Sequence, residues 1–140
     1  MEQHQGTLNP GVKVMVIDDS KTIRRSAQAL LKDTGVEVIT AVDGFDALVK
    51  IIDNAVHIIF VDVMMPRLDG YQTCALIKHH SALMATPVVM LSSRDGVFDK
   101  ARGRSVGSEQ FLTKPFSKET LLGAIQAHVP GFTVAAQPAP

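Results

Sequence analysis

Five short apolar segments, separated by longer amphipathic ones, constrain the fold of this 140-residue chain most strongly. Within each short segment apolar residues follow one another directly, which is typical of strands buried on both faces of a parallel sheet. The expected strands are residues 12–17, 37–42, 57–61, 87–91 and 109–112. Because strands and helical segments alternate along the chain, the sequence predicts an α/β fold with a doubly wound parallel sheet and right-handed crossovers.

The segments between the strands carry the spacing of amphipathic helices. In the first of them Ile23, Ala27 and Leu30 recur at intervals of four and three residues, while charged residues lie largely off that stripe. Helix starts are marked by residues whose side chains can accept the free amide hydrogens of a first turn. We expect these starts at Asp43-Gly44, Asp69-Gly70, Asp95-Gly96 and Ser117.

Composition narrows the class of protein. Apolar residues make up 46% of the chain, so a folded core is expected rather than disorder. Lys plus Arg and Asp plus Glu both number 14, and the resulting net charge of zero argues against a dedicated nucleic-acid binder. Cys74 is the only cysteine, which excludes an intramolecular disulfide and a multi-cysteine zinc site.

The length of the chain predicts a single domain. We divide it into a flexible N-terminus (1–11), a folded domain (12–129) and a Pro/Ala-rich tail (130–140). The N-terminus lacks the apolar run of a signal peptide, and no segment reaches the roughly 18 apolar residues of a membrane helix. We therefore expect a cytoplasmic protein that does not insert into membranes.

Polar side chains follow the predicted strands at the edge where a doubly wound sheet binds its ligands. Three carboxylates, one hydroxyl and one ammonium group are expected there, from Asp18, Asp19, Asp62, Ser92 and Lys114. Each residue alone has a structural explanation, such as a solvated turn, a helix cap or a surface lysine. Their conjunction at matching strand ends is what favours a functional site.

Electrostatics indicates what such a site binds. Two unit charges about 4 Å apart repel by roughly 4 kcal/mol at an effective dielectric near 20, so three clustered carboxylates need a cation or a proton. Lys114 supplies one positive charge and a divalent ion supplies two. Carboxylate oxygens suit Mg²⁺, which commonly completes its shell with phosphate oxygens. Ser92 and Lys114 could then donate hydrogen bonds to a phosphoryl group.

The segments VMVIDDS (14–20), FVDVMMP (60–66), VMLSS (89–93) and FLTKP (111–115) resemble the receiver domain of bacterial two-component response regulators. The resemblance extends over residues 12–129 and implies a flavodoxin/CheY-like fold. In that fold five parallel strands in the order 2-1-3-4-5 are flanked by five helices. More narrowly, the chain resembles stand-alone regulators of type IV pilus twitching motility.

The resemblance implies roles for the candidate residues. Asp62 is expected to accept a phosphoryl group from a phosphohistidine of a partner kinase, and Lys114 and Ser92 to contact that group. It also implies a cis Lys114–Pro115 bond and a Mg²⁺ site. The implied metal ligands are Asp19, Asp62 and the backbone carbonyl of Met64, with Asp18 acting through water.

Signalling is expected to follow from the same group. Ser92 would move toward the new charge and leave space into which Phe111 turns, so that the surface of the fourth helix, fifth strand and fifth helix changes. The expected partners are a CheA-like histidine kinase, or its phosphotransfer domain, and a pilus-motility output protein. We expect a monomeric phosphoacceptor that catalyses only its own phosphorylation and dephosphorylation. The family places Met64 and Arg94 beside the phosphoryl group.

Four other functions are open to this sequence. A phosphatase of the haloacid dehalogenase type shares the aspartate nucleophile and Mg²⁺, but it needs a second carboxylate where this chain has Met64. A flavin mononucleotide binder would need backbone donors where Asp18 and Asp19 repel an anion. A pseudo-receiver would dock without phosphate, and a phosphate sink would drain a shared kinase. A DNA-binding regulator is not expected, because only a short tail follows the last predicted helix.

Several other residues are expected to be structural. His57, His79 and His80 have no partner at metal-ligand spacing, and Cys74 is expected to pack in the core. The basic residues Lys100, Arg102 and Arg104 are expected to form a solvated helix face, with contact to a partner as the alternative.

Overall fold

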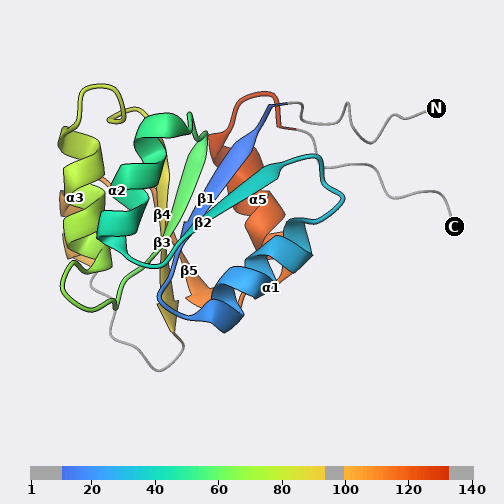
Figure 1. Ribbon diagram of the computed structural model, residues 1–140, viewed down its shortest axis with the longest axis horizontal. Coiled ribbons are helices and arrows are strands. Elements are labelled where there is room, and N and C mark those ends of the chain that lie inside the picture. The colour runs from blue at the N-terminus through green and yellow to red at the C-terminus, as the bar shows by residue number, and fades with distance from the viewer. Residues whose placement is uncertain (1–10, 94–99, 133–140) are drawn as a thin grey trace, which may run out of the picture.

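The computed structural model describes residues 11–93 and 100–132 and has the alternating order of elements that the sequence predicts (Figure 1). The strands are β1 (Lys13–Ile17), β2 (Glu37–Ala41), β3 (Ile58–Asp62), β4 (Val88–Ser93) and β5 (Gln110–Lys114). The helices are α1 (Lys21–Leu31), α2 (Gly44–Asp53), α3 (Gly70–His79), α4 (Lys100–Ser105) and α5 (Lys118–His128). Over these ranges no helix is long and apolar enough to span a bilayer.

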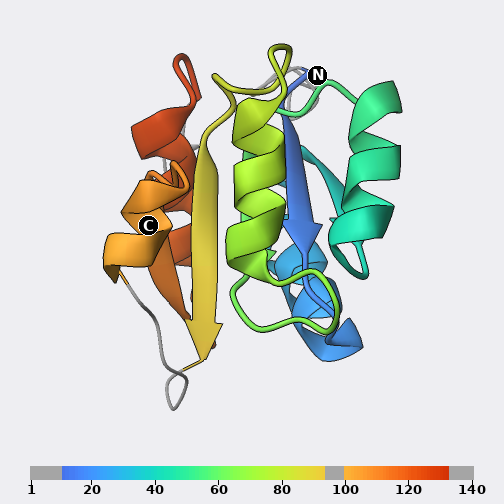
Figure 2. The ribbon, with the colours of Figure 1, turned by 90° about the vertical axis from the view of Figure 1, so that its left-hand side faces the viewer.

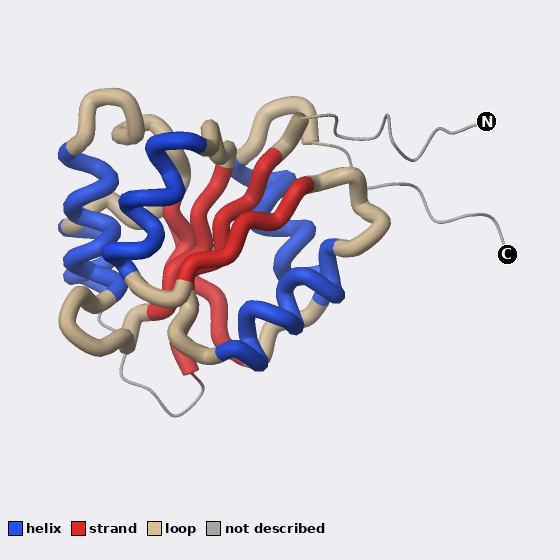
Figure 3. The backbone as a smooth tube through the Cα atoms, viewed as in Figure 1, coloured by secondary structure: helices blue, strands red, loops and turns tan. Residues whose placement is uncertain are grey.

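The five strands form one parallel sheet in the order β2-β1-β3-β4-β5, which confirms the predicted fold (Figure 3). The strands begin and end within one or two residues of the prediction, and the largest differences lie at their polar ends. β4 and β5 continue to Ser93 and Lys114 because backbone pairing proceeds from Ser92↔Thr113 to Ser93↔Lys114. Pairing of this kind joins backbone groups, so a pattern of apolar side chains does not reveal it.

Two hydrophobic cores explain the unbroken apolar runs. Val14 and Val16 of β1 pack in one core, whereas Met15 and Ile17 of the same strand pack in the other. Successive strand side chains point to opposite faces, so both faces of the sheet must be covered. α1 and α5 cover one face, and α2, α3 and α4 cover the other (Figures 1 and 2).

Helix starts follow the predicted signals wherever the structure describes them. Asp43 caps α2, and Asp69 and Ser117 cap α3 and α5 in reciprocal capping boxes. The fourth predicted start, Asp95-Gly96, lies outside the described residues. Most of the two predicted terminal segments also lies outside them, but Phe132 is buried beside Val129 in the core that α1 and α5 cover. Packing therefore continues past residue 129.

Gly70, the first residue of α3, permits a close approach to the end of β3. A Cβ atom at this position would overlap the carbonyl oxygen of Asp62 and lie 2.8 Å from the Cα of Val63. The Gly70 amide also donates to the carbonyl oxygen of Val63 over 2.9 Å. α3 thus begins directly against the strand end that carries Asp62, and only glycine fits there.

We predict that Gly70→Ala destabilises the protein by about 1–3 kcal/mol, because backbone rather than flexible side chain must move. The matched control is Gly123→Ala in α5, where an added Cβ meets nothing within 4 Å. That change should be neutral or stabilise by up to about 1 kcal/mol, as expected for glycine inside a helix. Urea unfolding of both variants measures the difference, and equal effects would contradict the proposed overlap.

Candidate functional site

Three carboxylates meet at the carboxyl edge of the sheet, as the sequence predicts. Asp18 and Asp19 follow β1 and Asp62 ends β3, and one oxygen of each lies within 4.8 Å of the others. Asp18 and Asp62 are buried, whereas Asp19 is exposed. The cluster therefore has a closed side inside the sheet edge and an open side at solvent.

Lys114 bridges the two buried carboxylates. Its Nζ donates to Asp18 Oδ2 and to Asp62 Oδ1, each over 3.1 Å. Lys114 is the last residue of β5, and the bond between it and Pro115 is cis. The ammonium group comes from two strands away from Asp62 in the sheet order, so the site joins the ends of β1, β3 and β5.

Backbone and side-chain donors fix Asp18 in place. Its Oδ1 accepts from the Ser20 amide over 2.9 Å, and its carbonyl oxygen accepts from Arg24 Nη1 over 2.6 Å. Ser20 also caps α1, through a 3.3 Å bond from the Ile23 amide to its Oγ. The sequence analysis does not predict this contact of Arg24. The one indication of it in the sequence is that Arg24 lies one turn into the helix that follows Asp18.

Burial and charge set the protonation of this site. Burial raises the pKa of Asp62 to about 6, and the negative charge of Asp18 adds to the rise. Lys114 and the Met64 amide, which donates to Asp62 Oδ1 over 3.4 Å, oppose it. Burial alone would lower the pKa of Lys114, but its hydrogen bonds and charge attraction to Asp18 and Asp62 raise it. Lys114 is thus charged at neutral pH. Asp62 is ionised there as well, although its surroundings destabilise the negative charge.

The donor set fits Mg²⁺. Among the described residues, Lys114 is the one cation paired with this cluster, through Asp18 and Asp62, which leaves negative charge to be compensated. The oxygens are of the hard type that Mg²⁺ prefers, and the exposed Asp19 leaves room for bound water. The described residues that could hold the ion are therefore Asp18, Asp19 and Asp62, with the carbonyl of Met64 as the expected backbone ligand.

Of the remaining predicted residues, Ser92 lies at the end of β4, Met64 follows β3, and Phe111 lies near the start of β5. Ser92 is buried, and its Oγ donates to the carbonyl of Ser93 over 3.3 Å. The Met64 side chain is 67% exposed, and the Phe111 ring is half-buried beneath Lys100. Arg94 lies outside the described residues.

The residues expected to be structural have local explanations. Cys74 is fully buried, burial raises the pKa of its thiol to about 11, and its Sγ contacts the carbonyl of Val106. His57 Nδ1 accepts from the Lys13 amide at the strand edge. The expected solvated basic face is only partly correct, because two of its members lie over aromatic rings: Lys100 over Phe111 and Arg102 over Tyr71.

Comparison with known proteins places this site in a family. Residues 14–126 match the profile of the family described as "Response regulator receiver domain". The chain belongs to this family. A relative, "Protein PilG" of Pseudomonas aeruginosa, is 75% identical over 123 residues, which cover 88% of this chain and 91% of that protein.

More distant receivers show the same fold. The "Alkaline phosphatase synthesis transcriptional regulatory protein PhoP" of Bacillus subtilis is 36% identical over 115 residues, covering 82% of this chain and 47% of that protein. A solved structure of the Vibrio cholerae chemotaxis protein CheY4 superposes with a TM-score of 0.78 at 36% identity. It covers 84% of this chain and 98% of that one. The receiver fold is therefore shown by sequence and by structure.

We predict that Asp62→Asn stabilises this receiver domain at pH 7.5 in the presence of a chelator. Asp62 has a pKa of about 6 when folded and an ordinary value of 3.8, so its contribution to stability is greatest below pH 3.8 and is lost as pH rises to about 6. The neutral variant avoids this loss of stability, which is on the order of 3 kcal/mol. Urea unfolding should show an advantage for the variant that is largest above pH 6 and shrinks toward pH 4.

The exposed carboxylate of Asp53 provides the matched control, because Asp53→Asn removes the same charge outside the cluster. Its stability should differ little from that of the unaltered protein at either pH. An advantage of Asp62→Asn that is the same at pH 4.5 and pH 7.5 would contradict the raised pKa.

Proposed function

We propose that this receiver domain accepts a phosphoryl group on Asp62 from a phosphohistidine of a chemotaxis-type histidine kinase. The observation that supports this most directly is a buried carboxylate held beside an ammonium group and two further carboxylates. In the transfer, a carboxylate oxygen of Asp62 forms a bond to phosphorus as the phosphorus–nitrogen bond breaks. The electron pair of that bond returns to the histidine ring.

The surrounding residues have separable roles in this proposal. Lys114, 3.1 Å from Asp62 Oδ1, pairs with the incoming phosphoryl oxygens and keeps its charge because its pKa is raised. Asp18, Asp19, Asp62 and the Met64 carbonyl would hold Mg²⁺. When bound, the ion neutralises charge on the phosphoryl oxygens during transfer. Ser92 supplies a hydroxyl donor from the end of β4.

The position of Phe111 supports the proposed signal. In the register of β4 and β5, Phe111 pairs with Met90, and Ser92 is two residues further along the same strand as Met90. Residues two apart lie on one face of a strand, and Phe111 and Met90 both pack in the core beneath α2 and α3. Movement of Ser92 toward a phosphoryl group can therefore open space for the Phe111 ring, which changes the face formed by α4, β5 and α5.

We further propose that the output is control of type IV pilus twitching motility. The resemblance of the sequence to twitching-motility regulators and its high identity to PilG support this output. The protein would act as a cytoplasmic, monomeric phosphoacceptor with a histidine kinase and a pilus-motility protein as partners. A phosphatase of the haloacid dehalogenase type is less well supported, because the exposed thioether of Met64 cannot exchange protons as that chemistry requires.

We predict that incubation with acetyl phosphate and Mg²⁺ adds one phosphoryl group, which intact-mass spectrometry detects. Asp62→Ala and omission of Mg²⁺ should each abolish the adduct, because the first removes the acceptor and the second leaves the phosphoryl charge uncompensated. Lys114→Gln should reduce the rate at least tenfold, since it removes a charged hydrogen-bond partner worth about 1.5–3 kcal/mol.

Asp53→Ala serves as the control for loss of an aspartate, because Asp53 is exposed at the end of α2. It should leave the yield of adduct unchanged. An adduct that persists in Asp62→Ala would overturn the assignment of the acceptor. No adduct with any donor, despite intact Mg²⁺ binding, would favour a pseudo-receiver.

A further inference from the structure

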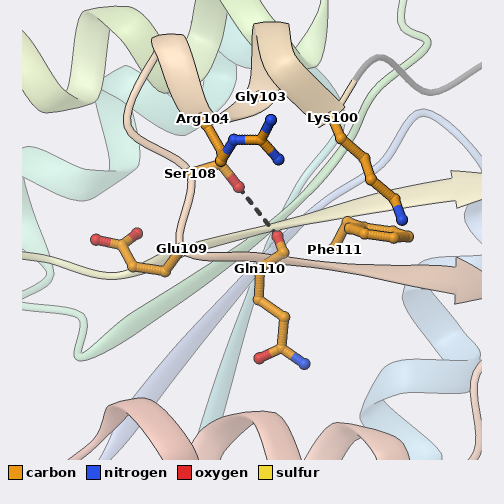
Figure 4. Close-up of a pocket in the computed structure, with 7 residues that line it drawn as sticks. All are labelled: Lys100, Gly103, Arg104, Ser108, Glu109, Gln110 and Phe111. Atoms are coloured by element: carbon orange, nitrogen blue, oxygen red, sulfur yellow. Dashed lines mark hydrogen bonds between the residues drawn. The ribbon is translucent and has the colours of Figure 1, made fainter.

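A cation lies over the ring that the proposed signal moves. Nζ of Lys100, the first residue of α4, is 4.7 Å from the centroid of the Phe111 ring on β5. Figure 4 shows the Lys100 side chain reaching from the end of the helix to this ring. A lysine ammonium within about 6 Å of a ring centroid is attracted by the negative face of the ring.

The described part of α4, residues 100–105, contains no acidic residue, so no carboxylate within it pairs with Lys100. Lys100 makes no ion pair with any residue in the described ranges. The contact with Phe111 is therefore the interaction that this ammonium group makes within the described structure.

The Phe111 ring is not enclosed on the side of α4. It borders a cavity of about 290 Å³ between α4 and β5, which Gly103, Arg104 and Gln110 also line (Figure 4). A ring that borders open space is less restrained by packing than one in a filled core. A single weak contact can then shift the balance between two positions of the ring.

We propose that Lys100 is a positioning residue for Phe111. Its ammonium group holds the ring beside the cavity between α4 and β5 and opposes the inward turn of the ring. This inference rests on the proposed function, in which that turn is the signal. The energy of an exposed cation–π contact changes such an equilibrium by a factor of about two to five. Lys100 thereby keeps the unphosphorylated protein in its resting state.

The test compares Lys100→Met, which keeps an unbranched chain and removes the charge, with Lys100→Arg, which restores a cation over the ring. Arg104→Met is the matched control, because it removes a neighbouring charge from the same cavity. Each variant is labelled with ¹³C in its phenylalanine rings and studied by NMR. The resonance of Phe111 is identified by its absence in Phe111→Leu. The rate of adduct formation with acetyl phosphate and Mg²⁺ is measured in parallel.

We expect Lys100→Met to move the chemical shift of the Phe111 ring in the unphosphorylated protein toward the value that it has in the phosphorylated protein. The rate of adduct formation should rise about two- to five-fold, since more molecules hold the ring inward before transfer. Lys100→Arg and Arg104→Met should match the unaltered protein in both measurements. Unchanged urea unfolding midpoints would exclude a general loss of structure as the cause.

The outcomes separate this inference from the function on which it rests. If Lys100→Met leaves the chemical shift and the rate unchanged while the unaltered protein is phosphorylated, the positioning role is wrong and the proposed function stands. An equal change in Arg104→Met also overturns it, because the effect would then belong to the charge around the cavity. Failure of the unaltered protein to form an adduct overturns the proposed function itself.

Discussion

The site depends on the interaction of the Lys114 ammonium group with two carboxylates. The ammonium nitrogen lies 3.1 Å from an oxygen of each of two buried carboxylates, Asp18 and Asp62, which would otherwise repel each other at the end of the sheet. Because the three residues end or follow β5, β1 and β3, this one cation also ties together strands that are distant in sequence. The contacts of Lys114 therefore both join the strand ends and balance the charge of the candidate site.

The rest of the fold holds this contact rigidly. Two cores cover both faces of the sheet, so the strand ends that carry the charges are anchored by buried side chains. Gly70 brings α3 against the end of β3, and Arg24 holds the backbone of Asp18 from α1. A cluster of like charges persists only in surroundings that fix it, because a looser edge would let the carboxylates separate into water.

The surroundings of Phe111, the residue that the proposed signal moves, are less tightly packed than those of the acidic cluster. Phe111 borders a cavity, and Lys100 of α4 lies over its ring. A two-state signal requires that a change at Asp62 shift a population elsewhere, and a ring beside a cavity has space for a second position. The short distance along β4 and β5, from Ser92 to Phe111, joins these two regions.

The sequence by itself determined the order of the elements, the parallel sheet and the residues at its edge, because apolar period, helix caps and strand-end charges are local patterns. It did not determine which atoms meet: the bridge from Lys114 to Asp18 spans 96 residues, and the close approach of Gly70 to Asp62 depends on how α3 packs. The same holds for Lys100, which a local pattern assigns to a solvated face. Only the tertiary structure decided these contacts, because they arise where segments from different strands and helices are brought together by burial on both faces of the sheet.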